Sequence, residues 1–199
     1  MAQALQTGNC LEPRQLVRVA RQICAALHYA HQFERQGDGL SVKGVIHRDI
    51  KPSNIFVLED QVLGATHPFV KVLDFGIARV ASEIAVAMGK TALEFLGTPQ
   101  YASPEQLMGE SLDSRSDIYS LGVVMYQMLS GQLPLQPLSN DFWPWAEAHA
   151  YQAPLTLQEL CPTIPLALAD IVMQCLAKDP RDRPASMAQL CDRLTICLA

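Results

Sequence analysis

The chain has 199 residues, of which 49% are hydrophobic, and it carries a formal net charge of −5 with a pI near 5.5. This length and composition predict one globular domain with enough apolar material for a sizeable core. The acidic balance argues against a basic surface of the kind that binds nucleic acid or anionic membranes. No secretory signal pattern opens the sequence, so we expect a cytoplasmic protein.

The first predicted element is a helix over residues 13–33, where Leu16, Ile23 and Leu27 recur at helical spacing. Two short strands are expected next, at 55–58 and 70–73. Further helices are predicted at 117–130, near 143–150, at 165–177 and at 185–197, with Pro165 and Pro184 in first-turn positions. The expected fold class is mainly α with a few short β-strands.

Two polar segments interrupt this series, from Glu34 to Gly44 and from Glu59 to Pro68. Both contain Gly or Pro. We interpret them as surface-loop insertions, which change stability little.

One stretch resembles a membrane span in its length. Between Asp117 and Asp141 lie 23 residues without a charge. Gly131 and two prolines break this stretch. Its helical part, Ile118 to Ser130, is apolar on nearly all sides, which favours a buried central helix and no membrane segment.

The six cysteines lie at positions 10, 24, 161, 175, 191 and 197 and form no Cys-x-x-Cys pair. Most of them fall at apolar helical positions. We therefore expect buried, reduced thiols in a cytosolic protein rather than a disulfide framework or a zinc site.

Residues 47–54 read His-Arg-Asp-Ile-Lys-Pro-Ser-Asn. This segment carries the carboxylate of Asp49, the ammonium of Lys51 and the carboxamide of Asn54. A second carboxylate follows an apolar run in Asp74-Phe75-Gly76. Asp and Asn also occur in turns because they bond their own backbone. Two motifs in this order favour a functional site over that alternative.

Three further motifs follow in the chain. Residues 97–105 read Gly-Thr-Pro-Gln-Tyr-Ala-Ser-Pro-Glu, 117–122 read Asp-Ile-Tyr-Ser-Leu-Gly, and 179–184 read Asp-Pro-Arg-Asp-Arg-Pro. In this order the five motifs resemble the protein kinase superfamily. The resemblance covers nearly the whole chain. It implies that 1–199 form the large C-terminal lobe of a kinase domain, with an activation segment at 77–105.

The resemblance implies how the site would work. Asp49 would accept or orient the proton of the attacking hydroxyl, and Lys51 would lie near the transferring phosphoryl group of ATP. Asn54 and Asp74 would be the magnesium ligands, because Mg²⁺ prefers hard oxygen donors. Phe56 matches the residue that supports the adenine ring. The phosphoryl acceptor would be a protein substrate.

The family pattern also implies structural roles. His47 is expected to pack under Phe75. Asp117 is expected to bond the backbone of the catalytic loop, and Arg183 to pair with Glu105.

The subclass rests on two positions. Lys51, two residues after Asp49, and Thr98 resemble Ser/Thr kinases, and Thr98 matches the threonine that bonds the catalytic aspartate and lysine. The phrases at residues 50–55 and 103–106 are similar to the bacterial eukaryote-like branch.

The family's small N-terminal lobe, which grips ATP with a Gly-rich loop and a strand lysine, is expected to be absent. The first lysine of the sequence is Lys43, and Lys71 lies on the strand that enters Asp74. Gly37-Asp38-Gly39 is followed by no third glycine at the required spacing.

We expect the chain to be inactive when alone and to be completed by an upstream or separately encoded small lobe. The alternative is a non-catalytic binding or scaffold fragment. A metal-dependent hydrolase using Asp49 and Asp74 is a remote third possibility.

The resemblance also suggests regulation. In kinases of this pattern, the arginine that corresponds to Arg48 pairs with a phosphorylated residue of the activation segment. With Thr98 committed to the site, the hydroxyl candidates after Asp74 are Ser82 and Thr91. We expect Thr91, seven residues before Thr98, to carry the phosphate.

Overall fold

The computed structural model describes residues 10–37, 40–62, 65–75 and 98–197; within it, 35–37, 40–43, 59–62 and 65–68 are described by their backbone. Gly76, Ser82, Thr91 and most of the expected activation segment lie outside the described residues.

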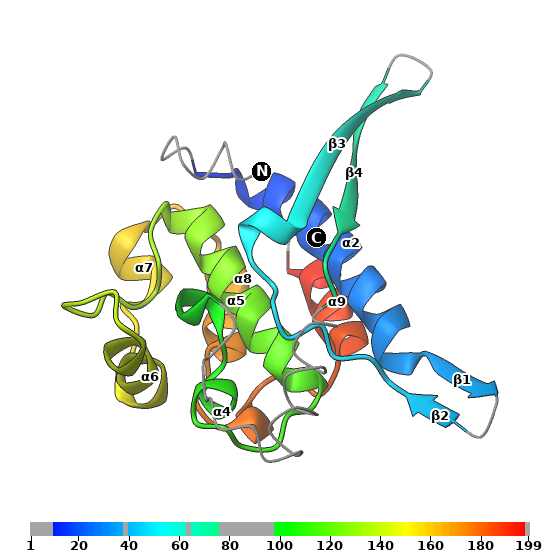
Figure 1. The fold of residues 1–199 in the computed structure, drawn as a ribbon. Coiled ribbons are helices and arrows are strands. Elements are labelled where there is room, and N and C mark those ends of the chain that lie inside the picture. Colours follow the sequence, from blue (N-terminus) through cyan, green and yellow to red (C-terminus); the bar gives the residue numbers. More distant parts are fainter. Residues whose placement is uncertain (1–9, 38–39, 63–64, 76–97, 198–199) are drawn as a thin grey trace.

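The described chain forms a helical body from which two β-hairpins project (Figure 1). The long helices are α2 (Pro13–Gln32) and α5 (Ser114–Ser130), and the latter runs through the middle of the body. The remaining helices are α4 (Pro104–Leu107), α6 (Phe142–Tyr151), α7 (Leu157–Leu160), α8 (Leu166–Cys175) and α9 (Met187–Ile196). The prediction of a mainly α fold with a few short strands is confirmed.

Helix α2 is amphipathic, and its apolar face packs on the core. Leu16, Ile23 and Leu27 are fully buried, and α9 lies against the helix. Pro13 lies in the first turn of the helix, where a backbone N–H has no partner within the helix, so the missing N–H of proline costs no hydrogen bond. The predicted helix over 13–33 is thus found almost as expected.

Helix α5 is buried on nearly every side, as predicted for the central helix. Asp113 caps its first turn by accepting the N–H of Arg115, and Gly131 ends it in a left-handed conformation with φ of 75°. At Gly122 the helix approaches α8 so closely that an added Cβ would lie 2.6 Å from the Cβ of Cys175. Among the described residues, no helix is both long and apolar enough to cross a membrane.

The later helix boundaries differ from the expected ones by a few residues. Pro165 stands just before α8, at its N-cap, rather than within its first turn. Pro184 precedes α9, and the hydroxyl of Ser186 caps that helix by accepting the N–H of Gln189.

The prediction that both polar segments are loops was wrong, because each forms part of a β-hairpin. Strands β1 (Glu34–Gly37) and β2 (Leu40–Lys43) pair antiparallel, as do β3 (Ile55–Val62) and β4 (Ala65–Val72). The backbone ladder continues through polar residues because the N–H and C=O groups that face the partner strand bond to it, whatever the side chains are.

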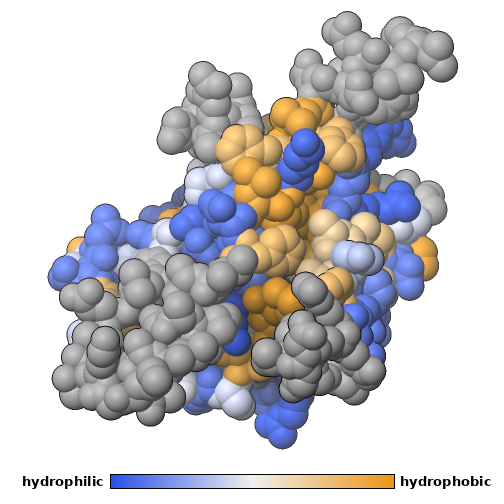
Figure 2. Space-filling view, turned by 45° about the vertical axis from the view of Figure 1, so that its right-hand side comes forward, coloured by the Kyte–Doolittle hydropathy of each residue, from blue (hydrophilic) through white to orange (hydrophobic). Residues whose placement is uncertain are grey.

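The second hairpin has one covered and one uncovered face. Ile55 and Val70 are buried, and the N–H of Val70 donates to Oε1 of Gln22 on α2 over 3.1 Å. Because side chains alternate along a strand, the next positions point the opposite way. Hydrophobic residues gather on this face of the molecule in Figure 2. We define the hairpin patch as the four exposed side chains Phe56, Leu58, Phe69 and Leu73.

The six cysteines are all free thiols, but the expectation that they are buried holds only in part. Cys24 and Cys175 are buried in the core, whereas Cys10 is exposed and Cys161, Cys191 and Cys197 are partly exposed.

Candidate active site

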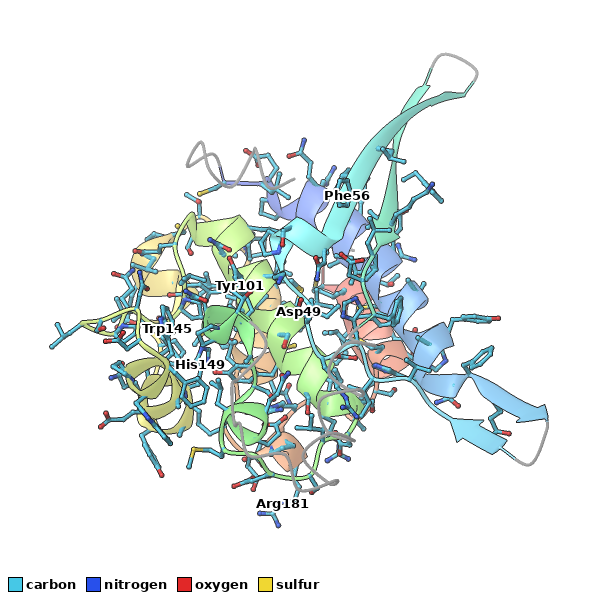
Figure 3. The ribbon with its side chains drawn as sticks, in the orientation of Figure 1. Asp49, Phe56, Tyr101, Trp145, His149 and Arg181 are labelled. Carbon is cyan, nitrogen blue, oxygen red and sulfur yellow. The ribbon has the colours of Figure 1, made fainter. Side chains whose placement is uncertain are left out.

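The motif at residues 47–54 forms an irregular loop between the two hairpins, below Phe56 in the view of Figure 3. It ends in a single 3₁₀ turn, η1 (Pro52–Asn54), which leads directly into β3. Pro52 starts this turn and is itself buried. Regular structure therefore holds the loop at its C-terminal end.

Four side chains of the predicted site meet around Asp49. The Nζ atom of Lys51 lies 2.9 Å from Oδ2 of Asp49 and donates to Oγ1 of Thr98 over 3.0 Å. Lys51 therefore links Thr98 to Asp49, because its Nζ atom contacts both side chains. The amide nitrogen of Asn54 donates to the backbone oxygen and to Oδ2 of Asp49, over 2.9 and 3.0 Å. We call these four side chains the Asp49 network.

Asp117 on α5 fixes the backbone of the loop at 47–54. Its fully buried carboxylate accepts the backbone N–H groups of His47 and Arg48, both over 2.8 Å. Nε2 of His31, from the end of α2, lies 2.7 Å from Oδ2 of the same carboxylate. One buried side chain on α5 thus fixes two consecutive peptide groups, as predicted for Asp117.

Two residues of the site have backbone conformations that residues with side chains rarely adopt. The φ angles are 65° for Arg48 and 57° for Asp74, and both residues lie in the left-handed region. Such a conformation costs about 1 kcal/mol or more for a residue other than glycine. At Arg48, the bond from its N–H to Asp117 helps to offset that strain.

His47 lies under the second motif, as predicted. Its ring centroid is 4.5 Å from that of Phe75. Burial lowers the pKa of His47, although Asp117 and the carbonyl of Leu73 act in the opposite direction. The neutral ring then donates from Nε2 to the Leu73 carbonyl (2.9 Å) and accepts the Asp49 N–H at Nδ1 (3.3 Å). The ring therefore ties the two motifs together.

Asn54 and Asp74, the residues predicted to bind magnesium, each have a side-chain oxygen that could serve as a ligand. The amide nitrogen of Asn54 is committed to Asp49, which turns Oδ1 to the other side. The carboxylate of Asp74 is exposed, and its neighbour Leu73 donates its N–H to the Asn54 carbonyl over 2.9 Å. One amide and one carboxylate oxygen suit Mg²⁺, which binds few protein ligands and keeps its remaining positions for water and phosphate. Among the described residues, no group of three or more His, Cys, Asp or Glu could hold a metal by itself.

Glu105 and Arg183 form the predicted buried pair. Their contacts are bidentate, at 2.8 and 2.9 Å, and the hydroxyl of Ser116 donates to the same carboxylate over 2.7 Å. Burial alone would raise the pKa of Glu105, but the bonds from Arg183 and Ser116 outweigh it and leave that pKa below its ordinary value. Glu105 therefore remains ionised, and it anchors α4 to the body.

The segment that follows the undescribed residues packs between the loop and the body. Thr98 precedes a 3₁₀ turn, η2 (Pro99–Tyr101), and the hydroxyl of Tyr101 donates to Oε1 of Gln127 on α5 over 2.8 Å. Gln106 on α4 donates to the carbonyl of Arg48 over 2.7 Å. This segment thus contacts the loop at 47–54 at Lys51 and at Arg48.

Sequence reasoning missed three supporting residues: His31, Gln106 and Ser116. Each bonds a predicted site residue, but nothing in the local sequence distinguishes it from other polar residues. His31 is 86 positions from Asp117, and Gln106 is 58 positions from Arg48. The proposed phosphate acceptor Thr91 lies outside the described residues, so its role stays a prediction.

A family model described as "Protein kinase domain" matches residues 1–194. The chain is 47% identical over 178 residues to serine/threonine-protein kinase A of Synechocystis, a match that covers 89% of this chain and 32% of that protein. It is 39% identical over 195 residues to serine/threonine-protein kinase Pkn1 of Myxococcus xanthus, covering 96% of this chain and 25% of the other. The chain therefore spans a third or less of the length of these relatives.

A crystal structure of a double mutant of the Mycobacterium tuberculosis PknI kinase domain has a similar fold. The TM-score is 0.67 at 20% sequence identity, and the match covers 98% of this chain and 62% of the other.

Proposed function

The chain belongs to the protein kinase family, and from this premise we propose that it is the large lobe of a bacterial Ser/Thr kinase domain, which transfers the phosphoryl group of ATP to Ser or Thr of protein substrates. In this proposal the lobe spans 1–199 and includes the activation segment 77–105.

The observation that carries the proposal is the Asp49 network. A carboxylate, an ammonium, a hydroxyl and a carboxamide meet within 3.0 Å contacts, although Thr98 is 47 residues from Lys51 in the sequence. Phosphoryl transfer requires mainly positioning and charge neutralisation, and this arrangement provides both. A loop whose Asp and Asn only satisfied their own turn would need no lysine or distant threonine.

The side chains have distinct roles in this proposal. Asp49 accepts a hydrogen bond from the hydroxyl of the substrate and orients it for attack. Lys51, now paired with Asp49 and Thr98, places a positive charge beside the transferring group. Thr98 holds the lysine from the substrate side of the site.

Asn54 and Asp74 would hold Mg²⁺ bound to ATP, and Phe56 would lie beneath the adenine ring. The metal would neutralise charge on the phosphates. Asn54 is already oriented by Asp49, and Phe56 is about half exposed, at 49%, on the hairpin patch above the site. The protein contributes orientation of the ligands, because Asn54 directly precedes β3 and Asp74 follows β4 closely.

We further propose that the chain alone is nearly inactive and acts with a kinase small lobe. The 199 residues contain no lysine before Lys43 that could take the nucleotide-gripping role. The hairpin patch gives such a lobe an apolar surface to cover, since exposed patches of this kind commonly mark interaction sites. The patch equally supports the alternative function, a non-catalytic binding or scaffold fragment, because a partner could cover it without any chemistry.

Reconstitution separates the two functions. The chain is assayed with ATP, Mg²⁺ and a protein substrate, alone and with a kinase small lobe joined upstream or co-expressed. Catalysis predicts negligible activity alone, activity with the small lobe, and a loss of at least about 100-fold on Asp49→Asn, the scale of a lost general base. A complex that binds ATP but transfers no phosphate would leave only the binding function.

The regulatory part of the proposal concerns Arg48 and Thr91. A phosphate on Thr91 would bring about −1.5 to −2 charges, and it could order its segment through bonds to Arg48. In the reconstituted kinase we expect phosphate on Thr91 and reduced activity of Thr91→Ala, with Ser82→Ala as the matched control. Phosphate mapped only to Ser82, or full activity of Thr91→Ala, would exclude this role.

A further inference from the structure

Two cysteines far apart in the sequence lie at one end of helix α5. The N–H of Leu11, next to Cys10, donates to the carbonyl of Met128 over 2.8 Å. The thiol of Cys161 lies 3.9 Å from the carbonyl of Leu129, the next residue of the same turn. Figure 1 agrees, because the start of the described chain, the end of α5 and α7 share one end of the molecule.

The environments of the two thiols are complementary. Cys10 is exposed and open to a soluble oxidant, whereas Cys161 is partly covered beside α7. Burial raises the pKa of the Cys161 thiol, and the neighbouring Cys10 raises it further. Cys161 therefore stays a protonated thiol at neutral pH and reacts slowly with a peroxide, so the exposed Cys10 is the one oxidised first.

The other four thiols are placed differently. Cys24 and Cys175 are buried between helices and have no access to solvent. Cys191 and Cys197 lie on and just after α9, where their thiols contact the carbonyls of Arg21 and Leu194. None of these four cysteines has a described hydrogen bond to the C-terminal end of α5.

We propose that Cys10 and Cys161 form a redox-sensitive pair, which a peroxide converts into a disulfide that ties the chain before α2 to the chain after α7. In the first step the thiolate of Cys10 attacks the peroxide, which gives a sulfenic acid and releases hydroxide or an alcohol. In the second step the Cys161 sulfur displaces water from that sulfenic acid and loses its proton. Two thiols are oxidised and one peroxide is reduced, so the electrons balance.

The Cys10–Cys161 disulfide would constrain most of the chain. It joins residues 10 and 161, so that most of the sequence lies within the closed loop. A disulfide of this kind restricts the unfolded chain and stabilises the folded one. A thiol reductant reverses it, which fits a compartment where disulfides are transient.

The test treats the reduced 199-residue chain with about one equivalent of hydrogen peroxide, followed by alkylation and peptide mapping without reduction. We expect one intramolecular link between the Cys10 and Cys161 peptides, a mass lower by about 2 Da, and a melting temperature higher by about 5 °C. Dithiothreitol should reverse all three. Cys10→Ser and Cys161→Ser should each abolish the link, and Cys197→Ser should retain it.

Two results would overturn the proposal. One is a link between other cysteines or between two chains. The other is Cys10 oxidised to sulfinic acid or beyond while Cys161 remains alkylated. Cys10 is exposed, so Cys10→Ser should fold normally and remains interpretable if Cys161→Ser proves unstable.

Discussion

Arg183 is a buried cation whose five N–H groups all donate inside the protein. Besides its two bonds to Glu105, it donates to the carbonyls of Ala177, Arg115 and Lys178 over 2.8 to 3.1 Å. Its guanidinium also lies 4.8 Å from the ring centroid of Tyr119. A cation satisfied in this way depends on its counter-charge, because little water is present to replace it.

Removing that counter-charge should therefore destabilise the fold strongly. We expect Glu105→Gln to lower the free energy of unfolding by about 3–5 kcal/mol, the range for breaking a buried pair. The matched control is Arg181→Ala, which removes an exposed arginine paired with Asp179 two residues away. Urea unfolding of both variants is the measurement. Equal midpoints would show that the buried pair contributes no more than a surface pair.

His149 makes stability depend on pH in a way that can be isolated. Its Nδ1 is 2.8 Å from the Tyr119 hydroxyl, and burial, reinforced by Lys178, lowers the pKa of His149 to about 3. The unfolded chain binds this proton near pH 6.5 and the folded chain does not. The stability is therefore complete above pH 6.5 and falls below it, by at most about 1.4 kcal/mol per pH unit until pH 3.

The check compares chemical unfolding of the parent and His149→Asn at pH 7.5 and pH 5. Asparagine can still bond Tyr119 but does not titrate, so we expect its stability to fall less over this interval. The same slope in both proteins would mean that other groups carry the pH dependence. Lys178, whose pKa burial lowers to about 8, is mostly protonated at pH 7.5 and fully protonated at pH 5, so it contributes little to the difference.

The sequence predicted the contacts around Asp49 and Asp117 better than the residues that support them. Asp49, Asn54 and Asp117 belong to motifs whose order is visible without a structure. The packing expected of His47 against Phe75 and the pairing expected of Glu105 with Arg183 are found. His31 could not be predicted, because its role exists only once α2 and α5 lie together. The same is true of His149, an ordinary helical histidine in sequence whose partner is 30 residues away.

At the level of elements, the contact between α5 and α8 depends on one missing side chain. Gly122 allows the backbones to approach until the Cβ of Cys175 fills the space that a side chain would need. The sequence predicted both helices but not this distance, because a glycine within a buried helix can reflect many causes.

Gly122→Ala tests this contact directly. Alanine favours the helix by about 1 kcal/mol, whereas overpacking costs about 1–3 kcal/mol. We expect a net loss in the free energy of unfolding, and Cys175→Ala should not rescue it, because the clash is with Cβ. A variant more stable than the parent would contradict the close approach. Thermal unfolding followed by circular dichroism is sufficient.

The hairpins show why sequence patterns can miss the true length of a strand. Gly and Pro in the segment from Glu59 to Pro68 predicted a loop, yet Pro68 lies in β4 opposite Glu59. A two-stranded sheet consists only of edge strands, so a proline can face outward without removing a bond from the ladder. The strand therefore extends past the point where hydrophobic alternation stops.

At the scale of the molecule, the hairpin patch is an exposed apolar surface that a partner could cover. Phe56 and Phe69 are each about half exposed, so a partner could bury further apolar area worth about 1 kcal/mol per ring. We expect Phe56→Ser with Phe69→Ser to weaken binding of a small lobe by about 30-fold. The same change should reduce self-association in light scattering.

The control for this prediction is Trp143→Ser, which removes an exposed aromatic side chain of α6 away from the patch. Titration calorimetry with the small lobe should give the parent affinity for this variant. Equal weakening by both changes would place the interface elsewhere.

Asp117 has a consequence for the order in which this protein matures. During synthesis the loop at 47–54 leaves the ribosome about 70 residues before the carboxylate that its backbone needs. Until that carboxylate arrives, little offsets the left-handed strain at Arg48, and the loop has no reason to prefer its final shape. Bringing such distant partners together requires closing a long loop first, which slows folding. The nascent chain therefore acquires the geometry of the candidate site only after α5 has docked, and a truncated product of stalled translation would contain every residue of the 47–54 loop without that geometry.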